Sequence, residues 1–306
     1  MYLSPDNASA MNSHARDGSA NVDHNAGACH TRNIGELIQE TQSLTTVQVE
    51  AILNHQREHG LRFGESAVAL GLVQGRDVLW ALSQQFQYPY ADDVRSPLHA
   101  DLVVANQPFS AQAEVFRSLR SQITMRTKVE RQERRAIAVV SPDHGDGKSY
   151  FVANLAVAFS QLGGRTLLVD ADLRSPRQHE LFGLNNITGL SDILSGRNNE
   201  RVVRPVPSLP SLYVLPVGAP PPNPQELVEG AAFGQLMQEL LGKFDYVLVD
   251  TPATCEGADT NVIAARCGSS VAIARRGRSR MNALKTLVSV INASNVRVVG
   301  ALLNEF

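Results

Sequence analysis

The chain has 306 residues, a formal net charge of −2 and 43% hydrophobic residues, which is enough for two domains with buried cores. The near-neutral charge, without a long basic run, argues against nucleic-acid binding. No apolar run reaches the length of a membrane span, and the N-terminus lacks the pattern of a secretory signal peptide. The cysteines Cys29, Cys255 and Cys267 have no metal-binding spacing and suit a reducing compartment. We therefore expect a cytoplasmic protein of two domains.

The N-terminal third is predicted to hold a polar tail and a small helical domain. Residues 1–31 are rich in Asn, Ser, Ala, Asp and Gly, and we expect them to be disordered. Residues 32–93 contain two copies of one pattern, because Asn33-Ile-Gly-Glu-Leu aligns with Arg62-Phe-Gly-Glu-Ser. The same offset pairs three apolar positions: Leu44 with Val73, Val49 with Val78, and Leu53 with Leu82. Each copy predicts a short helix, a turn and a longer amphipathic helix.

This helical domain resembles the N-terminal domain of type II secretion and pilus ATPases, in some of which two tandem copies bind cyclic di-GMP. The second copy has Arg62, Gly64 and Gly71 at the spacing of that motif, so the resemblance implies these residues as possible cyclic di-GMP contacts. The first copy has Asn33 in place of the arginine and Gln42 in place of the second glycine. Asparagine cannot stack and pair with phosphate as arginine does. We therefore expect weak or no cyclic di-GMP binding, with docking to a partner as the alternative role.

Residues 94–108 are predicted to be an interdomain linker, since they carry two prolines and little periodicity. The second domain, residues 109–306, begins with a helix on which Glu114, Arg117 and Arg120 recur on one broad side. On the residues alone, a solvated helix face with local ion pairs explains these three charges.

A strand, a glycine-containing loop and a helix follow one another between residues 136 and 159. Such a loop directs backbone N–H groups at phosphates from the positive end of a helix dipole. Lys148 would reach the β- and γ-phosphates, and Ser149 would ligate Mg²⁺. The first glycine of this P-loop motif is replaced by Pro142. The predicted ATP contacts in the loop are Gly145, Asp146, Gly147, Lys148, Ser149 and Tyr150.

Two further buried-strand patterns end in carboxylates. The run from Thr166 reaches Asp170 and is followed by Asp172 and Arg174, and a second run ends at Asp250. Parallel strands deliver such side chains to one edge of a sheet, so we expect the three carboxylates to gather there around Mg²⁺. Arg174 would either stabilise phosphate charge or pair with a carboxylate.

The remaining pattern alternates strands and helices to the end of the chain. Strands are predicted at 211–216, 270–274 and 296–303, with helices beginning near 225 and spanning about 280–293. The predicted fold class is α/β. A doubly wound, mostly parallel sheet forms the P-loop domain, preceded by a small helical domain and a disordered N-terminal tail.

Three motifs together resemble the bacterial tyrosine kinases, which are P-loop proteins of polysaccharide export. They are Asp170-Ala-Asp172-Leu-Arg174, Val247-Leu-Val-Asp250 and Glu114-Val-Phe-Arg117-Ser-Leu-Arg120. The resemblance covers about residues 108 to 306. It implies an ATP- and Mg²⁺-dependent protein tyrosine autokinase that regulates exopolysaccharide chain length and export.

The resemblance also implies roles for single residues. Lys148, Asp170 and Asp172 would be catalytic, with Asp172 activating the acceptor hydroxyl. Mg²⁺ would be held by Ser149, Asp170 and Asp250, and Asn304 would contact adenine. Glu114, Arg117 and Arg120 would pack against a neighbouring subunit of a homo-oligomer. The implied activator is an inner-membrane chain-length regulator of the Wzz type, which would place the protein peripherally at the inner membrane.

Two departures bear on the function. Asp143 stands where the related positioning ATPases of cell division and plasmid partition carry a signature lysine, which favours the kinases. Many of these kinases end in a tyrosine-rich tail, whereas this chain stops at Phe306 without one. Its tyrosines are Tyr2, Tyr88, Tyr90, Tyr150, Tyr213 and Tyr246. The alternative function is therefore a nucleotide-dependent assembly scaffold, or a MinD- or ParA-like ATPase with little kinase activity.

Overall fold

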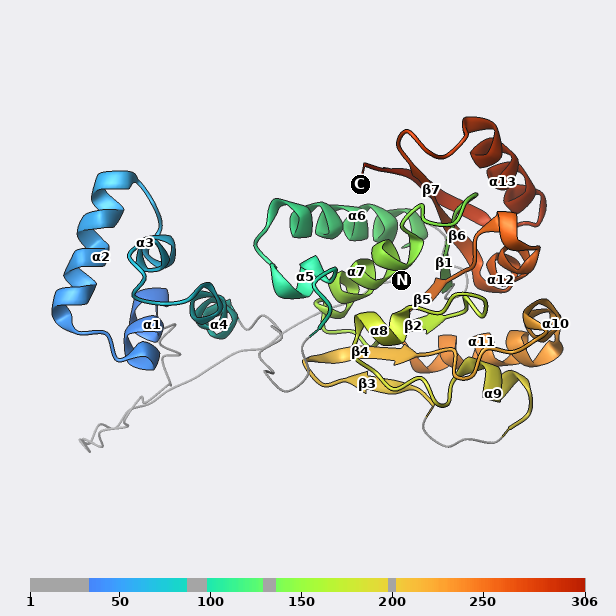
Figure 1. Cartoon of the computed structure of the whole chain (residues 1–306), viewed down its shortest axis with the longest axis horizontal. Helices are drawn as coiled ribbons and strands as arrows, with labels where there is room; N and C mark the ends of the chain where they lie inside the picture. Colours follow the sequence, from blue (N-terminus) through green and yellow to red (C-terminus); the bar gives the residue numbers. More distant parts are fainter. Residues whose placement is uncertain (1–32, 87–97, 129–135, 198–201, 306) are drawn as a thin grey trace, which may run out of the picture.

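The computed structural model describes two units of the chain, a helical unit and a P-loop unit (Figure 1). The described residues are 33–86, 98–128, 136–197 and 202–305. The polar tail predicted at residues 1–31 lies outside them, as do Tyr2, Tyr88 and Tyr90. In the described part of the chain, no helix is both long enough and apolar enough to cross a membrane.

The described residues of the helical unit form two short and two longer helices in alternation. These are α1 (Ile34–Gln42), α2 (Thr46–His59), α3 (Phe63–Ala69) and α4 (Gly75–Phe86). The side chain of Thr45 caps α2 by accepting the backbone N–H of Gln48, and the Gln48 side chain in turn accepts the backbone N–H of Thr45. At the start of α3, the N–H of Arg62 donates to the Glu65 carboxylate at 2.8 Å.

The buried core residues of this unit occupy equivalent positions in the two copies of the sequence repeat. Its buried apolar residues form three pairs separated by the same offset as Asn33 and Arg62: Ile38 with Ala67, Leu44 with Val73, and Ile52 with Ala81. Gly64 is also needed for packing, because a Cβ at this position would lie 2.5 Å from Cγ1 of Val78 on α4. Two copies of one helical hairpin therefore share a single core, in which each buried position of the first copy has a larger side chain than the equivalent position of the second.

The P-loop unit is built on a seven-stranded sheet with the strand order β3-β4-β2-β5-β1-β6-β7. The strands are β1 (Ala136–Val140), β2 (Thr166–Asp170), β3 (Arg204–Val206), β4 (Leu209–Leu215), β5 (Tyr246–Asp250), β6 (Gly268–Arg275) and β7 (Arg297–Asn304). All neighbours pair in parallel except β3, which is antiparallel to β4. This confirms the predicted doubly wound, mostly parallel sheet.

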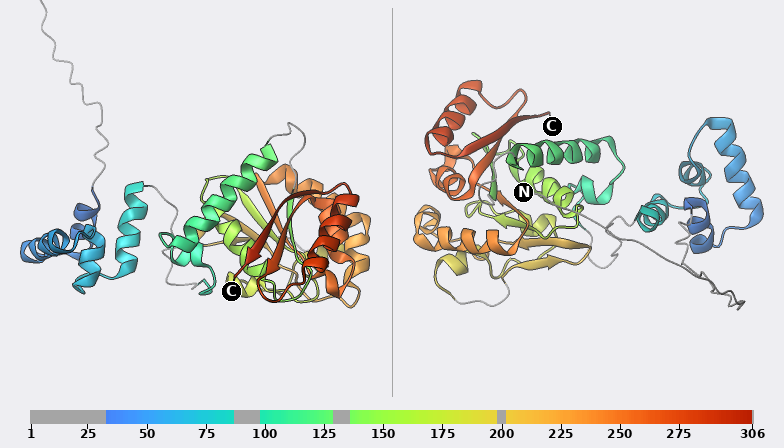
Figure 2. Two further views of the ribbon diagram at one scale, coloured as in Figure 1. Left: turned by 90° about the horizontal axis from the view of Figure 1, so that it is seen from above. Right: turned by 180° about the vertical axis from the view of Figure 1, so that it is seen from behind.

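Helices cover both faces of the sheet, as the two apolar faces of each buried strand require. One face carries α5 (Val103–Asn106), α6 (Ala111–Lys128), α7 (Lys148–Ser160) and α8 (Gln178–Leu181). The other carries α9 (Leu190–Leu194), α10 (Pro224–Glu229), α11 (Ala231–Lys243), α12 (Asp259–Cys267) and α13 (Met281–Ala293). Figure 2 shows the green helices and the orange and red helices on opposite sides of the strands. Side chains of β1 alternate between the two layers: Ile137 and Val139 face the first, and Ala138 and Val140 the second.

The core of this unit extends into the segment predicted to be the linker. Leu102, Val104 and Ala105 are buried with the side chains of α7. The N–H of Val104 donates to Oδ1 of the buried Asn154 at 3.1 Å. The P-loop unit therefore begins before residue 109, and α5 belongs to its first helical layer.

Candidate nucleotide-binding site

The glycine-containing loop connects β1 to α7 in the P-loop arrangement. Lys148 is the first residue of α7, and Gly147 before it has φ +98°. This backbone conformation requires glycine, and a Cβ here would also lie 2.3 Å from Nδ2 of Asn304 and displace that side chain. Pro142, which replaces the first glycine of the motif, is buried, and its carbonyl accepts the N–H of Cys255 at 3.1 Å.

Asp146 holds the loop in place from within. Its side chain is fully buried and accepts the N–H of Asp143 at 3.0 Å and the hydroxyl of Ser279 at 2.7 Å. Its carbonyl oxygen accepts from Nδ2 of Asn304 at 3.0 Å. These three contacts tie the loop to itself and to the segments that follow β6 and end β7. Because the carboxylate of Asp146 already accepts two hydrogen bonds from the protein, the ATP contact predicted for this residue would have to come from its backbone.

Lys148 lies at the carboxyl edge of the sheet, as predicted. It is only 5% exposed, and its Nζ donates to the hydroxyl of Ser141 at 3.2 Å. Burial raises the pKa of both Asp172 and Asp250, and the nearby positive charge of Lys148 opposes that rise. Ser149, the next residue, is half-buried on the first turn of α7.

Asp170 and Asp250 are directly opposite each other in the β2–β5 register, and both are fully buried. Asp170 accepts the backbone N–H groups of Arg177 and Gln178 on Oδ2 and of Asp172 on Oδ1. Burial and then the Asp250 charge raise the pKa of Asp170 well above its usual range. Burial also raises the pKa of Asp250 to about 6, although its bond with Gln178 opposes the shift.

Asp172 completes the group of carboxylates at this edge. It is 4% exposed, and its Oδ1 accepts the N–H groups of Arg174 at 3.2 Å and Ser175 at 2.9 Å. Burial raises its pKa, while the N–H of Ser175 and the charge of Lys148 oppose that shift. Both of these hydrogen bonds engage Oδ1, so Oδ2 is the oxygen that can serve a reacting group.

Arg174 pairs with a carboxylate, which was one of the two roles predicted for it. Its Nε and Nη2 donate to the two oxygens of the buried Asp259 at 2.7 and 3.1 Å. This bidentate pair joins the loop after β2 to the start of α12 and raises the pKa of Arg174. The arginine is thereby turned toward α12.

The residues at this edge fit a magnesium nucleotide. Oδ1 of Asp250 is buried and accepts no hydrogen bond of ordinary geometry, although the Ser149 side chain is near enough to oppose the rise in the pKa of Asp250. A carboxylate oxygen of this kind, beside a P-loop serine and a lysine, is the donor that Mg²⁺ or its bound water prefers. Ser149 and Asp250 would thus hold the metal, and the metal role of Asp170, whose two oxygens already accept backbone N–H groups, stays a prediction.

A cleft of about 410 Å³ lies beside the loop and could receive the rest of a nucleotide. Its lining includes Gly145, Gly147, Tyr150, Arg275 and Asn304. Asn304, the last residue of β7, therefore borders the cleft in which the adenine contact was predicted. Burial and the Asp101 charge raise the pKa of Tyr150, whose hydroxyl accepts from Nε2 of Gln112 on α6 at 2.8 Å.

The three charged residues predicted to meet a neighbouring subunit have contacts within the chain. Arg117 pairs with the exposed Glu114 at 2.9 Å and also donates to the carbonyl of Pro108. Arg120 donates to the carbonyl of Ala158 near the end of α7 at 2.6 Å. These contacts are compatible with the solvated helix face, and the intersubunit role stays a prediction.

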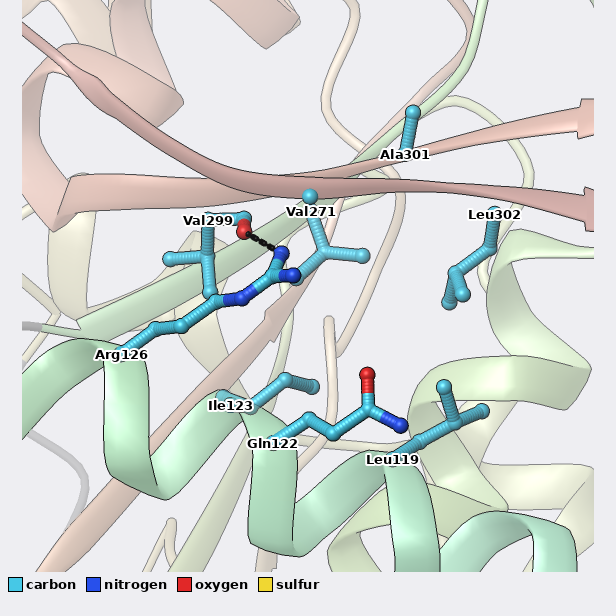
Figure 3. A pocket seen from close by; sticks show the side chains of 9 residues that line it. Leu119, Gln122, Ile123, Arg126, Val271, Val299, Ala301 and Leu302 are labelled. Atoms are coloured by element: carbon cyan, nitrogen blue, oxygen red, sulfur yellow. Dashed lines mark hydrogen bonds between the residues drawn. The ribbon is translucent and has the colours of Figure 1, made fainter.

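Further along α6, side chains close a small pocket against β7, as Figure 3 shows. Leu119, Ile123 and Arg126 point from the helix toward the strand. Nη1 of Arg126 donates to the carbonyl of Val299 at 2.6 Å, next to a register shift between β6 and β7. This side of α6 is therefore occupied by the protein's own sheet.

Sequence reasoning missed three side chains that build the site. Ser279 holds Asp146, Asp259 holds Arg174, and Gln178 donates to Asp250 at 2.7 Å. None belongs to a motif, and each comes from a loop or a helix start. The position of Gln178, eight residues after Asp170, does not predict a contact with the site unless the conformation of the intervening loop is known.

The residues predicted to contact cyclic di-GMP are found at the start and end of α3. Arg62 is exposed beside Gly64, which packs on Val78, and Gly71 is exposed in the following turn. No ligand contact is required to explain either glycine, because Gly71 has φ +67° and Gly64 is closely approached by α4.

Comparison with known proteins also indicates a P-loop nucleotide-binding domain. The ParA family model, described as NUBPL iron-transfer P-loop NTPase, matches residues 132–304. The tyrosine-protein kinase wzc of Salmonella typhimurium is 31% identical over 67% of this chain, which spans only 28% of that protein. The tyrosine-protein kinase YwqD of Bacillus subtilis is 30% identical over 68% of this chain and 87% of its own length.

A solved structure agrees with these relatives. The kinase domain of the Escherichia coli tyrosine kinase ETK is 28% identical, with a TM-score of 0.64, over 69% of this chain and 82% of that one. The ParA match, over residues 132–304, includes Lys148, Asp170 and Asp250 at the carboxyl edge of the sheet. The chain therefore belongs to the bacterial tyrosine-protein kinase family of P-loop proteins.

Proposed function

We propose that this protein is an ATP- and Mg²⁺-dependent tyrosine autokinase that regulates exopolysaccharide chain length and export. The observation that carries the proposal is the convergence of Lys148, Asp172 and Asp250 on one edge of the sheet, next to the loop at Gly147. Family membership supports the tyrosine specificity, because the relatives are named tyrosine-protein kinases.

In this proposal the chain positions charge and moves one proton. Lys148 would bind the β- and γ-phosphates, and Ser149 and Asp250 would hold Mg²⁺, which when bound would neutralise charge on the transferring phosphoryl group. Asp172 accepts the proton of the tyrosine hydroxyl through Oδ2. Burial raises the pKa of Asp172, which makes it a stronger base than a solvated aspartate. Its two backbone N–H donors hold Oδ1 and so fix the direction of Oδ2.

Asp170 has a supporting part in this arrangement. Its oxygens accept three backbone N–H groups from the loop that carries Asp172. Removal of its carboxylate would therefore release that loop, besides removing a charge that helps to bind Mg²⁺ through water. Loss of activity in an Asp170 variant alone cannot separate these effects, so Asp172 and Lys148 are the residues to test first.

Purified protein incubated with labelled Mg-ATP should phosphorylate tyrosine, with an inner-membrane chain-length regulator added as the activating partner. Lys148→Met should abolish the label because the phosphates lose their buried cation. Asp172→Asn should reduce labelling by at least about a hundredfold while Mg-nucleotide binding persists. Equal labelling by Lys148→Met and the unchanged protein would refute the kinase assignment.

A nucleotide-dependent assembly scaffold is the second candidate. The observation that favours it is the state of the described tyrosines, since Tyr150, Tyr213 and Tyr246 are all half-buried. Phosphotyrosine mass spectrometry on protein taken from cells separates the two functions. A lack of phosphotyrosine on this chain and its partner, combined with a nucleotide-dependent change in oligomer mass, would favour the scaffold.

The helical unit, the oligomer and the location belong to the same proposal. We infer that the helical unit docks to a partner and binds cyclic di-GMP weakly or not at all. The side of α6 that carries Glu114, Arg117 and Arg120 would meet a neighbouring subunit. The protein would be held at the inner membrane by its chain-length regulator, so deletion of that regulator should release it from the membrane fraction.

A further inference from the structure

Gln178 is a polar residue whose backbone and side chain together contact the three motifs of the site. It begins α8, in the segment that returns across the sheet edge after Asp172, and it is fully buried. Its backbone N–H donates to Oδ2 of Asp170 at 3.0 Å. Its side-chain Nε2 donates to Oδ2 of Asp250 at 2.7 Å and to the carbonyl of Ser149 at 3.2 Å.

The chemistry of the neighbours fixes the orientation of this amide. The carboxylate of Asp250 and the carbonyl of Ser149 are both acceptors, so only the NH₂ group of Gln178 can face them. The amide oxygen must then point away from both, and Oε1 is indeed buried without a hydrogen-bond partner. Oδ1 of Asp250 is the other buried acceptor in this cluster that lacks a partner.

These contacts constrain one oxygen of Asp250 and leave the second for a ligand. A carboxylate attached through one Cβ can rotate, so a donor on Oδ2 determines the direction in which Oδ1 points. The same NH₂ group is anchored on Ser149, whose hydroxyl is the expected metal ligand of the P-loop. Gln178 thus sets the position of one expected metal ligand relative to the other.

We propose that Gln178 is a positioning residue, which orients Asp250 and Ser149 for the Mg²⁺ that accompanies the nucleotide. The inference rests on the magnesium-nucleotide site of the proposed function and adds a residue that contacts neither the tyrosine nor the phosphates. Residues that orient metal ligands in this way typically change metal affinity by about 10- to 100-fold when they are replaced.

The test compares nucleotide binding with and without the metal. Gln178→Met keeps the length of the side chain but removes the donor. A fluorescent ADP analogue should bind this variant about as well as the unchanged protein in EDTA, because Lys148 and the loop N–H groups are intact. The Mg²⁺ concentration that gives half-maximal enhancement of binding should rise at least about tenfold. Gln161→Met is the matched control: it alters a glutamine beyond the end of α7 whose Oε1 is also unpartnered, and it should leave the Mg²⁺ dependence unchanged.

An unchanged Mg²⁺ dependence in folded Gln178→Met would overturn the inference, and so would equal weakening of binding in EDTA and in Mg²⁺. Gln178→Leu also removes the donor and carries the same comparison if the methionine variant does not fold. Failure of the proposed function looks different. The unchanged protein would then bind ADP with normal Mg²⁺ dependence but never label tyrosine, or would bind no nucleotide at all.

Discussion

Replacing Asp250 by asparagine should stabilise the nucleotide-free protein while it removes Mg²⁺-dependent nucleotide binding. Asp250 is fully buried and faces Asp170 across the β2–β5 register. Burial raises its pKa to about 6, and the charge of Asp172 adds to that shift, against the opposing effects of Gln178 and Lys148. The ionised side chain is therefore unfavourable in the folded protein, and asparagine keeps the shape without the charge.

The expected gain in stability follows from the difference between the folded and unfolded pKa values. An aspartate in an unfolded chain has a pKa of about 3.9, so a folded value of about 6 corresponds to about 3 kcal/mol above pH 6. Because the folded-state pKa is the higher one, the folded protein retains a proton that the unfolded chain releases between about pH 4 and pH 6. The cost is thus absent below about pH 4, grows through this window and is complete above it.

Thermal unfolding followed by circular dichroism, without nucleotide and in EDTA, measures this effect. Asp250→Asn should melt about 6 to 12 °C above the unchanged protein at pH 7.5, and the gain should fall by about half at pH 5. Asp259→Asn is the control with the opposite sign, since it removes the partner of Arg174 and should lower the melting temperature. An Asp250→Asn protein that melts at or below the unchanged protein at pH 7.5 would refute the reasoning.

Three further predictions concern the helical unit and α6. Gly64→Ala places a Cβ 2.5 Å from Val78 Cγ1 and should destabilise the helical unit by about 1 to 3 kcal/mol, whereas adding Val78→Ala should restore most of the loss in a thermal melt. Charge reversal at Arg117 and Arg120 should shift the oligomer toward monomer in light scattering while ATP binding persists. Charge reversal at Arg126, which faces β7, should leave the mass unchanged. An unchanged mass in both variants would mean that Arg117 and Arg120 lie on a solvent-exposed face and not in a subunit interface. Calorimetry with cyclic di-GMP should show weak or no binding, and a Kd below 1 μM, about −8 kcal/mol, would contradict this.

The sequence was sufficient to predict which strands carry the site. The apolar runs before Asp170 and Asp250 are uncharged and short, which is typical of parallel strands covered on both faces. Once both strands run in the same direction, their carboxyl ends must lie at one edge, and the β2–β5 register places the two carboxylates opposite each other. The repeat in the helical unit was equally readable, because the offset that aligns Asn33 with Arg62 also relates its buried core residues.

Other parts of the molecule had no readable signal. Strand β3 is three residues long and contains Pro205, which removes a backbone donor and is tolerated because the strand lies at the edge of the sheet. The predicted linker extended to residue 108, yet Leu102 within it is fully buried. The sequence did not show this because the adjoining four-residue helix α5 is too short to have a recognisable periodicity. The partner of Arg174 was unpredictable for another reason: Asp259 is remote in the sequence, and only the tertiary structure brings the two together.

The polar residues of the site divide by how their oxygen atoms are engaged. Asp146 and Asp170 accept hydrogen bonds from the protein on both carboxylate oxygens, so they fix the loops before any ligand binds. Asp250 and Gln178 each keep one buried oxygen without a partner, and such atoms destabilise the protein until a ligand satisfies them. The loops are therefore ordered during folding, so ligand binding does not have to supply the entropic cost of ordering them. A ligand that supplies the missing contacts should also raise the stability of the fold by mass action. Asp170 and Asp250 are the same residue type at equivalent strand ends, and the segments that fold over them give them different tasks.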